Sequence, residues 1–270
     1  VVFAALVASV IAEPGSAGFA WTLTAAIAFS HAPQLISLLR RRTRATTEPD
    51  PASGWMRPRA VWAAVAPLLL GSVCAQLLLN GIPVIIPAMA RNAAEATAAG
   101  QLLAAFTLSR IPLFLVVPLQ SALLPMLTGA LHDGDRAKLV RMMRLLALGL
   151  LGLGVAAVGV GYLAGPWLVG LIFGPEYVLG GWHVALLALG VAAYIVLILV
   201  TQVLVASVRH RLVAWSWLSG LLVAALVLAV VPDLLLRAEL AFLLGSVTGW
   251  VVGTTLVLSE RRERVLQSVA

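Results

Sequence analysis

The chain has 270 residues, of which 61% are apolar and only 11% are charged, and its mean hydropathy is +1.04. A water-soluble domain holds about 45–50% apolar and about 25% charged residues, so this composition excludes an ordinary soluble fold. It predicts an all-α fold instead, a polytopic bundle of helices that cross a membrane. The single cysteine, Cys74, excludes a disulfide within the chain and is interpreted as a small core residue.

The beginning of the chain is interpreted as the end of another lobe. The first apolar run, residues 1–12, is too short to cross the hydrocarbon core of a bilayer, which needs about 20 residues. We interpret it as a partial span and expect the chain to be a fragment of something longer. A complete span is predicted at about residues 18–39, so residues 1–42 would be the last helices of a truncated N-terminal lobe.

A polar stretch separates these residues from the rest of the chain. Residues 43–59 are rich in Pro, Thr and Ser, which is typical of a mobile linker, and we predict a cytoplasmic linker between two lobes. Residues 60–270 would then form a six-helix C-terminal lobe with a short cytoplasmic tail. The whole prediction is seven complete spans and one partial span, with the later six at about 60–87, 98–127, 145–164, 178–208, 212–231 and 238–258.

The basic residues support this count because they collect on one side of the predicted membrane. If the linker is cytoplasmic, alternating spans place 15 of the 18 Lys and Arg residues on the cytoplasmic side. This bias is the positive-inside rule, so it also predicts a cytoplasmic C-terminus. It accounts for the net charge of +7 and removes the reason to expect nucleic acid as a partner. The fifteen are Arg40, Arg41, Arg42, Arg44, Arg57, Arg59, Arg136, Lys138, Arg141, Arg144, Arg209, Arg211, Arg261, Arg262 and Arg264.

Polar residues inside the predicted spans are the candidates for substrate binding. Arg110 is the one basic residue within a span, where a charge is costly and commonly functional. A guanidinium can bind phosphate oxygens in a bidentate fork, although Arg110 could equally snorkel or bond a neighbouring carbonyl. The uncharged candidates are Gln76, Asn80, Gln101, Gln120 and Gln202, which would line a wet cavity or hydrogen-bond across helices.

Prolines and glycines mark two further features. Prolines 83, 87, 112, 118 and 125 crowd two consecutive spans, and we place the aqueous cavity beside them, with simple kinking as the alternative. Gly245, Gly249 and Gly253 follow one another at intervals of four and line one face of the last span. Such a face lets another helix backbone approach closely, and we expect tight packing there and in the glycine-rich span at 145–164.

The remaining titratable groups predict no catalytic or metal site. The four histidines lie far apart in the sequence, and we find no nucleophile–base set or phosphate-binding loop, so we expect neither an enzyme nor a cofactor. All eleven carboxylates, including Glu176 and Glu239, are expected in loops or at span ends. Ion relays commonly use an acid within the membrane. We therefore expect coupling through a carboxylate to reside outside this chain.

Several motifs resemble those of bacterial lipid-linked oligosaccharide flippases. These proteins belong to the multidrug/oligosaccharidyl-lipid/polysaccharide (MOP) exporter superfamily. The similarity covers about residues 60–258 and rests on the order and spacing of short motifs. They are LLLNGIPVII from Leu77, Ala98-Ala99-Gly100, the Ser109-Arg110-Ile111-Pro112 turn, Leu124-Pro125 before Gly134-Asp135, and Phe173-Gly174-Pro175-Glu176-Tyr177.

The resemblance implies a MATE-like fold of two six-helix lobes around a central cavity, working by alternating access. A polyprenyl-diphosphate-linked oligosaccharide would cross from the cytoplasmic to the outer leaflet of a bacterial cell membrane, for polysaccharide biosynthesis. Arg110 matches the family's cavity arginines by position. Membrane lipids and the glycan lipid would be partners, and glycan polymerases or glycosyltransferases are candidates.

Three alternatives stay open at this point. A drug or metabolite cation antiporter of the same superfamily would share the fold. A membrane glycan polymerase or ligase would need a large outer loop with reactive residues, whereas the outer loops predicted here are short. A transport-inactive membrane scaffold would only bind partners.

Overall fold

The computed structural model describes residues 58–114, 116, 118, 125–126, 129 and 136–269, which belong to one compact unit. Every regular element in these ranges is a helix, as the composition predicts. Five helical stretches are long and apolar enough to cross a membrane, so the described residues are consistent with a multi-pass membrane protein. The predicted spans at 1–12 and 18–39, and the linker up to residue 57, lie outside the described residues. The five stretches are Val65–Met89, Arg144–Leu163, Gly181–Ala206, His210–Val230 and Leu234–Leu256.

The first of these stretches is a helix with a defect in its middle. Helix α3 (Pro58–Gln76) runs without a loop into a π-helical turn, Leu77–Gly81, and then into α4 (Ile82–Met89). π-helical turns are rare and occur frequently at functional sites. Pro83 lies in the first turn of α4, where its missing N–H is tolerated. The span predicted at about 60–87 is therefore present, but its hydrogen-bonding pattern changes at residue 77.

Helix α5 (Ala93–Ser109) begins with a reciprocal cap. The side-chain oxygen of Asn92 accepts a hydrogen bond from the backbone N–H of Glu95 at 2.9 Å, and the Glu95 carboxylate accepts from the N–H of Arg91 at 2.7 Å. The first bond satisfies a donor that the first turn of a helix leaves free, and the second ties the residue before the cap to that turn. They fix the tight connection between α4 and α5.

The other end of α5 is followed by a turn inside a predicted span. The helix ends at Ser109, and residues 110–112 form a turn in which the N–H of Ile111 reaches the carbonyl of Leu108 at 3.1 Å. Pro112 has no N–H to continue an α-helical ladder. The α-helix is therefore interrupted at residues 110–112 within the span predicted at about 98–127 and resumes at Leu113, and the predicted Ser109–Pro112 turn is confirmed. Most residues between 115 and 135 lie outside the described part of the chain.

The predicted break at residues 173–177 is also confirmed. Helix α7 (Arg136–Leu163) is followed by the short helix α8 (Gly165–Phe173), a 3-10 turn at Pro175–Tyr177, and then α9 (Gly181–Ala206). Gly174 has a φ of 108°, a conformation that residues with a Cβ rarely adopt. The side chain of Gln101 donates to the carbonyl of Glu176 at 3.0 Å and holds the break against α5.

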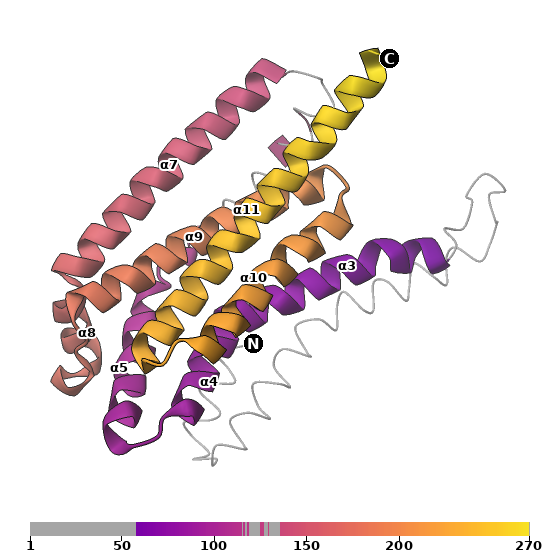
Figure 1. Ribbon diagram of the computed structural model, residues 1–270. Helices are drawn as coiled ribbons and strands as arrows, with labels where there is room; N and C mark the ends of the chain where they lie inside the picture. Colours follow the sequence, from indigo (N-terminus) through magenta and orange to yellow (C-terminus); the bar gives the residue numbers. More distant parts are fainter. Residues whose placement is uncertain are drawn as a thin grey trace, which may run out of the picture. The chain divides into compact units, whose positions relative to one another are not determined.

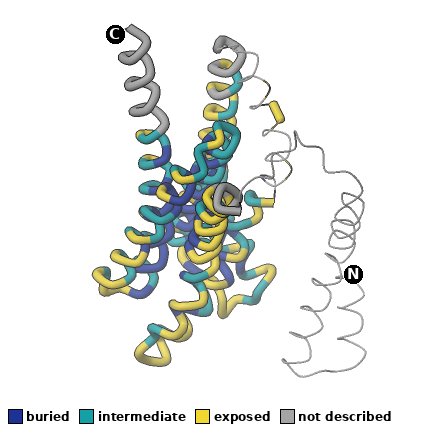
Figure 2. The backbone as a smooth tube through the Cα atoms, turned by 90° about the vertical axis from the view of Figure 1, so that its right-hand side faces the viewer, coloured by how far each residue is buried: buried dark blue, intermediate teal, exposed yellow. Residues whose placement is uncertain are grey.

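Helix α9 is the centre of the described bundle. It packs against α7 on one side and α11 (Leu234–Val269) on the other, and α10 (His210–Val230) lies between α11 and α3 (Figure 1). The buried residues gather in the middle of the bundle, whereas the outer helix faces are exposed (Figure 2). Many of the exposed side chains are large and apolar, which suits a surface that contacts lipid.

Glycines set the distance between α10 and α11. A Cβ on Gly249 would lie 2.9 Å from the Ser216 carbonyl oxygen, and one on Gly253 would lie 2.7 Å from the Ser216 hydroxyl oxygen. The tight packing predicted for the glycine face of the last span is thus confirmed. The prediction is only partly right for α7, because Gly149, Gly152 and Gly159 have no described atom within 4 Å of such a Cβ.

The helices alternate in direction, so the basic segments come to one end of the bundle. The start of α7, the connection between α9 and α10, and the end of α11 all lie at the upper end in Figure 1. Each of these segments carries two or more of the Lys and Arg residues that were predicted to share one side. That this side faces the cytoplasm stays a prediction.

Candidate substrate-binding site

The candidate site is built around Arg110, at the point where α5 ends. Arg110 is the C-cap residue of that helix, and its side chain is half-buried. Its guanidinium lies over the ring of Phe106 from the same helix, 4.2 Å from the ring centre, in a cation–π contact. The helix end and this ring together direct Arg110 toward α3 and the π-helical turn.

The guanidinium supplies a hydrogen-bond donor that the backbone of the neighbouring helix lacks. In an α-helix the carbonyl of Leu79 would accept from the N–H of residue 83, but residue 83 is proline and has no N–H. Nη2 of Arg110 donates to this carbonyl instead. Arg110, at the end of α5, thus supplies the donor that Pro83 lacks, next to the π-helical turn.

A chain of amide side chains extends from Arg110 along the exposed face of the same helix. Nη1 of Arg110 donates to the side-chain oxygen of Asn80 at 3.2 Å, and the Asn80 amide donates to the side-chain oxygen of Gln76 at 2.7 Å. Gln76 and Asn80 line an open groove of about 460 Å³. The other residues of the groove are Ser72, Val73, Leu77, Gly81 and Val84.

Aromatic side chains from α5, α9 and α11 pack next to this hydrogen-bonded chain. Phe106 packs edge-on against Phe242 of α11 with ring centres 4.9 Å apart, and Phe242 stacks on Tyr194 of α9 at 5.6 Å. The Tyr194 hydroxyl donates to the carbonyl of Ala75 at 3.1 Å. Two carbonyls that flank or belong to the π-helical turn, those of Ala75 and Leu79, therefore receive donors from other helices.

The structure brings three of the six candidate residues together, whereas Gln101 donates to the carbonyl of Glu176. Arg110, Asn80 and Gln76 form one hydrogen-bonded chain. Gln202 lies half-buried in the second half of α9, and no contact joins it to this chain among the described residues. Gln120 lies outside the described residues. Whether these residues bind a substrate stays a prediction.

Arg110 has one further donor in this site. Its Nε is buried and has no hydrogen-bond partner among the described residues. A buried donor without an acceptor is unfavourable, so the site favours an acceptor at that position. A negatively charged oxygen would satisfy both the donor and the charge of the guanidinium.

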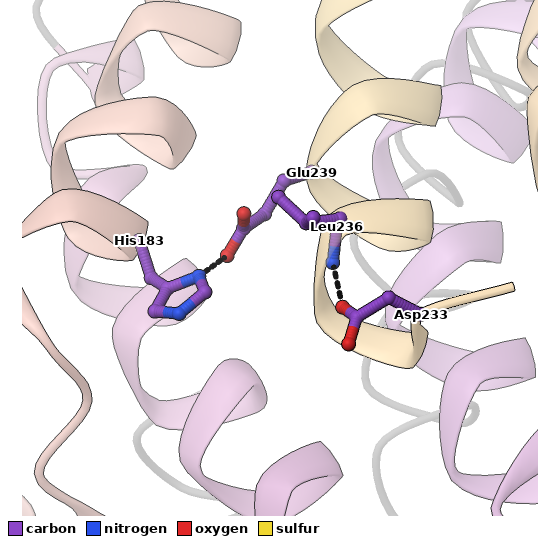
Figure 3. A network of polar contacts seen from close by, with 4 residues as sticks. All are labelled: His183, Asp233, Leu236 and Glu239. Carbon is purple, nitrogen blue, oxygen red and sulfur yellow. Dashed lines mark hydrogen bonds and ion pairs between the residues drawn. The ribbon is translucent and has the colours of Figure 1, made fainter. Parts of the chain in front are cut away.

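A second polar pair was missed by the sequence prediction. Nδ1 of His183, in the first turn of α9, lies 2.8 Å from Oε1 of Glu239 in α11 (Figure 3). Glu239 lies near the start of α11, which agrees with the expected position at a span end, but the sequence did not show that its side chain is enclosed. It lies within the apolar stretch Leu234–Leu256 and its side chain is 0% exposed. No periodic pattern signals this contact, because it joins residues 56 positions apart.

The described residues contain no group of three or more His, Cys, Asp or Glu side chains placed to hold a metal ion. The Arg110 chain and the pair His183–Glu239 are two polar arrangements in these ranges that join side chains of different helices. The first offers a cation and amide groups to an anion. The second offers a carboxylate and an imidazole, which exchange protons readily.

Comparison with known proteins finds relatives in Mycobacterium tuberculosis. The uncharacterized protein Rv1510 of strain H37Rv and the uncharacterized protein MT1558/MT1560 of strain CDC 1551 are each 30% identical to the chain over 250 residues. Each match covers 90% of this chain and 53% of the relative, so the chain spans about half the length of these curated relatives. No protein-family model matches the chain. No solved structure matches it either.

Proposed function

We propose that the chain forms the second lobe and adjacent helices of a MOP-type membrane flippase that moves a polyprenyl-diphosphate-linked oligosaccharide from the cytoplasmic to the outer leaflet. The flippase would work by alternating access in the bacterial cell membrane. The observation that carries the proposal is the hydrogen-bonded chain Arg110–Asn80–Gln76, which opens on a groove beside a π-helical turn.

The position of this chain supports a site for an anionic lipid headgroup. Asn80 and Gln76 are exposed on an otherwise apolar helix, and a polar face of this kind is unfavourable against lipid tails. It is favourable beside a water-filled cavity between lobes, where broken helices also find acceptors and donors for their free backbone groups.

The chemistry of Arg110 supports a diphosphate in particular. A planar guanidinium binds phosphate oxygens in pairs, and Nε still lacks an acceptor among the described residues. The amides of Asn80 and Gln76 would bind sugar hydroxyl groups or water next to the phosphates. The exposed apolar residues Val73 and Val84 of the same groove would contact the polyprenyl chain.

The test is deletion of the full-length gene followed by measurement of lipid-linked glycan in each leaflet. We expect the glycan lipid to accumulate in the cytoplasmic leaflet, and a normal distribution would contradict the proposal. Complementation with Arg110→Lys and Arg110→Ala should fail or be strongly reduced, because lysine lacks the fork. Arg91→Ala is the matched control, since it removes the same charge from an exposed connection outside the groove.

A cation antiporter of the same superfamily is the second candidate. The buried carboxylate of Glu239 favours it, because intramembrane acids commonly bind the ions that drive such exchange. An antiporter would leave glycan lipids normally distributed in the deletion strain and would change the cellular accumulation of organic cations. If neither quantity changed, a transport-inactive scaffold would be the remaining reading.

A further inference from the structure

The contact between His183 and Glu239 has the features of a binding site rather than of a packing contact. The Glu239 side chain is 0% exposed, whereas the His183 side chain is 27% exposed. The carboxylate is thus enclosed, and the imidazole reaches from it to the surface. The ring nitrogen Nε2 points away from Glu239 in Figure 3.

Glu239 is not fully satisfied by its neighbours. Oε1 lies 2.8 Å from the imidazole, but Oε2 is buried and has no hydrogen-bond partner among the described residues. A carboxylate in apolar surroundings needs hydrogen-bond donors, a counter-charge or a bound proton, because water no longer solvates it. The neighbouring residues Ala238 and Leu187 line an apolar pocket and offer no side-chain donor.

We propose that His183 and Glu239 form a proton-binding site that links the start of α9 to the start of α11. In the unloaded state Glu239 is a carboxylate and neutral His183 donates its Nδ1–H to Oε1. A proton from water binds Nε2, and the Nδ1 proton moves to Oε1. Glu239 is then a neutral acid that donates to Nδ1, His183 is neutral with its proton on Nε2, and the pair has gained one positive charge.

The charged groups around this pair are engaged elsewhere. Just before α11, Asp233 accepts from the N–H of Leu236 at 2.9 Å (Figure 3), and Arg237 of α11 donates to the carbonyls of Val231 and Pro232. The charged groups from the other elements at this end are Arg91 and Glu95 from the α4–α5 connection and Glu176 from the break before α9, and the tyrosines there are Tyr162 and Tyr177.

None of these groups forms an ion pair with His183 or Glu239 among the described residues. Asp233 is the nearest acid in the sequence, and its carboxylate accepts from the N–H of Leu236 rather than contacting Glu239. Arg237, 6% exposed, is held at the connection between α10 and α11 by its two backbone acceptors. In this proposal the protonation state of the pair therefore depends on the His183–Glu239 contact and on water that reaches His183.

This inference does not rest on the glycan substrate. It states what the pair binds, and it applies equally to a flippase and to an antiporter. In either kind of transporter, closing α9 onto α11 at this end would favour the protonated pair. Separating the two helices would expose Glu239 to water and release the proton.

The test is a pH titration of the full chain in lipid vesicles, followed by infrared difference spectroscopy between about pH 5 and pH 8, where a histidine-linked site changes charge. We expect the carbonyl-stretch band of a protonated carboxyl group, and we expect ¹³C-labelled glutamate to shift it. The band should be lost in Glu239→Gln and kept in Glu176→Gln, whose acid is exposed. In His183→Gln its midpoint should move.

Three results would overturn the proposal. They are the absence of a titrating glutamate band in the wild-type chain, a band that persists in Glu239→Gln, and an unchanged midpoint in His183→Gln. A midpoint that differs between sodium chloride and choline chloride would assign the site to a sodium ion instead. The isotope shift needs no variant, so the test stands even if Glu239→Gln fails to fold, and it needs no glycan lipid, so its failure is separate from that of the proposed function.

Discussion

Gly220 and Gly245 face each other where α10 crosses α11, and each occupies the space that a Cβ on the other would need. A Cβ on Gly220 would lie 2.5 Å from the carbonyl oxygen of Gly245, and one on Gly245 would lie 2.8 Å from the carbonyl oxygen of Gly220. Because the obstacle is backbone on both sides, neither helix can yield by moving a side chain. The two helices are held at a separation that only glycine permits.

Replacement of Gly220 by alanine should therefore destabilise the chain. We expect a loss of about 1–3 kcal/mol, the usual cost of inserting atoms into a packed interior. The measurement is thermal unfolding in detergent micelles. The control is Gly152→Ala in α7, where no described atom lies within 4 Å of the new Cβ and alanine improves helix propensity. Equal stability of the two variants would contradict the packing described for α10 and α11.

Pro83→Ala should weaken the link between α5 and the π-helical turn. The variant restores an N–H at residue 83, which can bond the carbonyl of Leu79 and compete with the guanidinium of Arg110. We expect slower hydrogen–deuterium exchange over residues 79–84 and a looser Arg110 side chain. Pro87→Ala is the control, because it restores an N–H one turn later in the same helix, away from that carbonyl. Unchanged exchange in Pro83→Ala would contradict the hydrogen-bonding scheme.

Gly174→Ala should destabilise the break before α9. Its φ of 108° lies in a region that side chains disfavour, and the new Cβ would lie 2.7 Å from the carboxylate of Glu176. A cost of about 1–3 kcal/mol is typical of such backbone strain. Gly180→Ala serves as the comparison, since its φ is −58° and its Cβ would meet only His183 at 3.7 Å. Thermal unfolding should separate the two variants; a Gly174→Ala chain as stable as Gly180→Ala would argue against strain.

The sidedness of the membrane arrangement can be tested with reporter fusions. A fluorescent protein joined after Ala270 should mature and fluoresce, because the basic end of the bundle is predicted to face the cytoplasm. Alkaline phosphatase joined after Val178 should be active, because the break before α9 lies at the opposite end (Figure 1). Activity of phosphatase after Ala270 would reverse the predicted orientation.

Features that depend on local residue chemistry could be predicted from the sequence. Glycine and proline marked the break at residues 173–177, because both residues restrict or release the backbone wherever they stand. The turn at 109–112 was expected from the resemblance of its motif. The interval of four between Gly245, Gly249 and Gly253 predicted a face for close packing, since that interval returns to one side of a helix. Hydropathy predicted the five helices that are long enough to cross a membrane.

Features that depend on contacts between distant residues could not be predicted. Glu239 was expected at a span end, and only the packing of α9 on α11 shows that its side chain is enclosed. Arg110 and Asn80 were separate candidates in the sequence. Their hydrogen bond exists because the π-helical turn brings residues 79 and 80 to the end of α5.

The bond from Arg110 to the carbonyl of Leu79 has a mechanical consequence. A side chain at the end of one helix supplies the donor that the Leu79 carbonyl of another helix lacks. A ligand that binds the guanidinium would therefore leave this carbonyl without a donor. A phosphate that competes for Arg110 would therefore change the bend between α3 and α4 directly. Ligand binding and helix curvature would both depend on this one hydrogen bond, so the coupling between them would not need to pass through the other helices of the bundle.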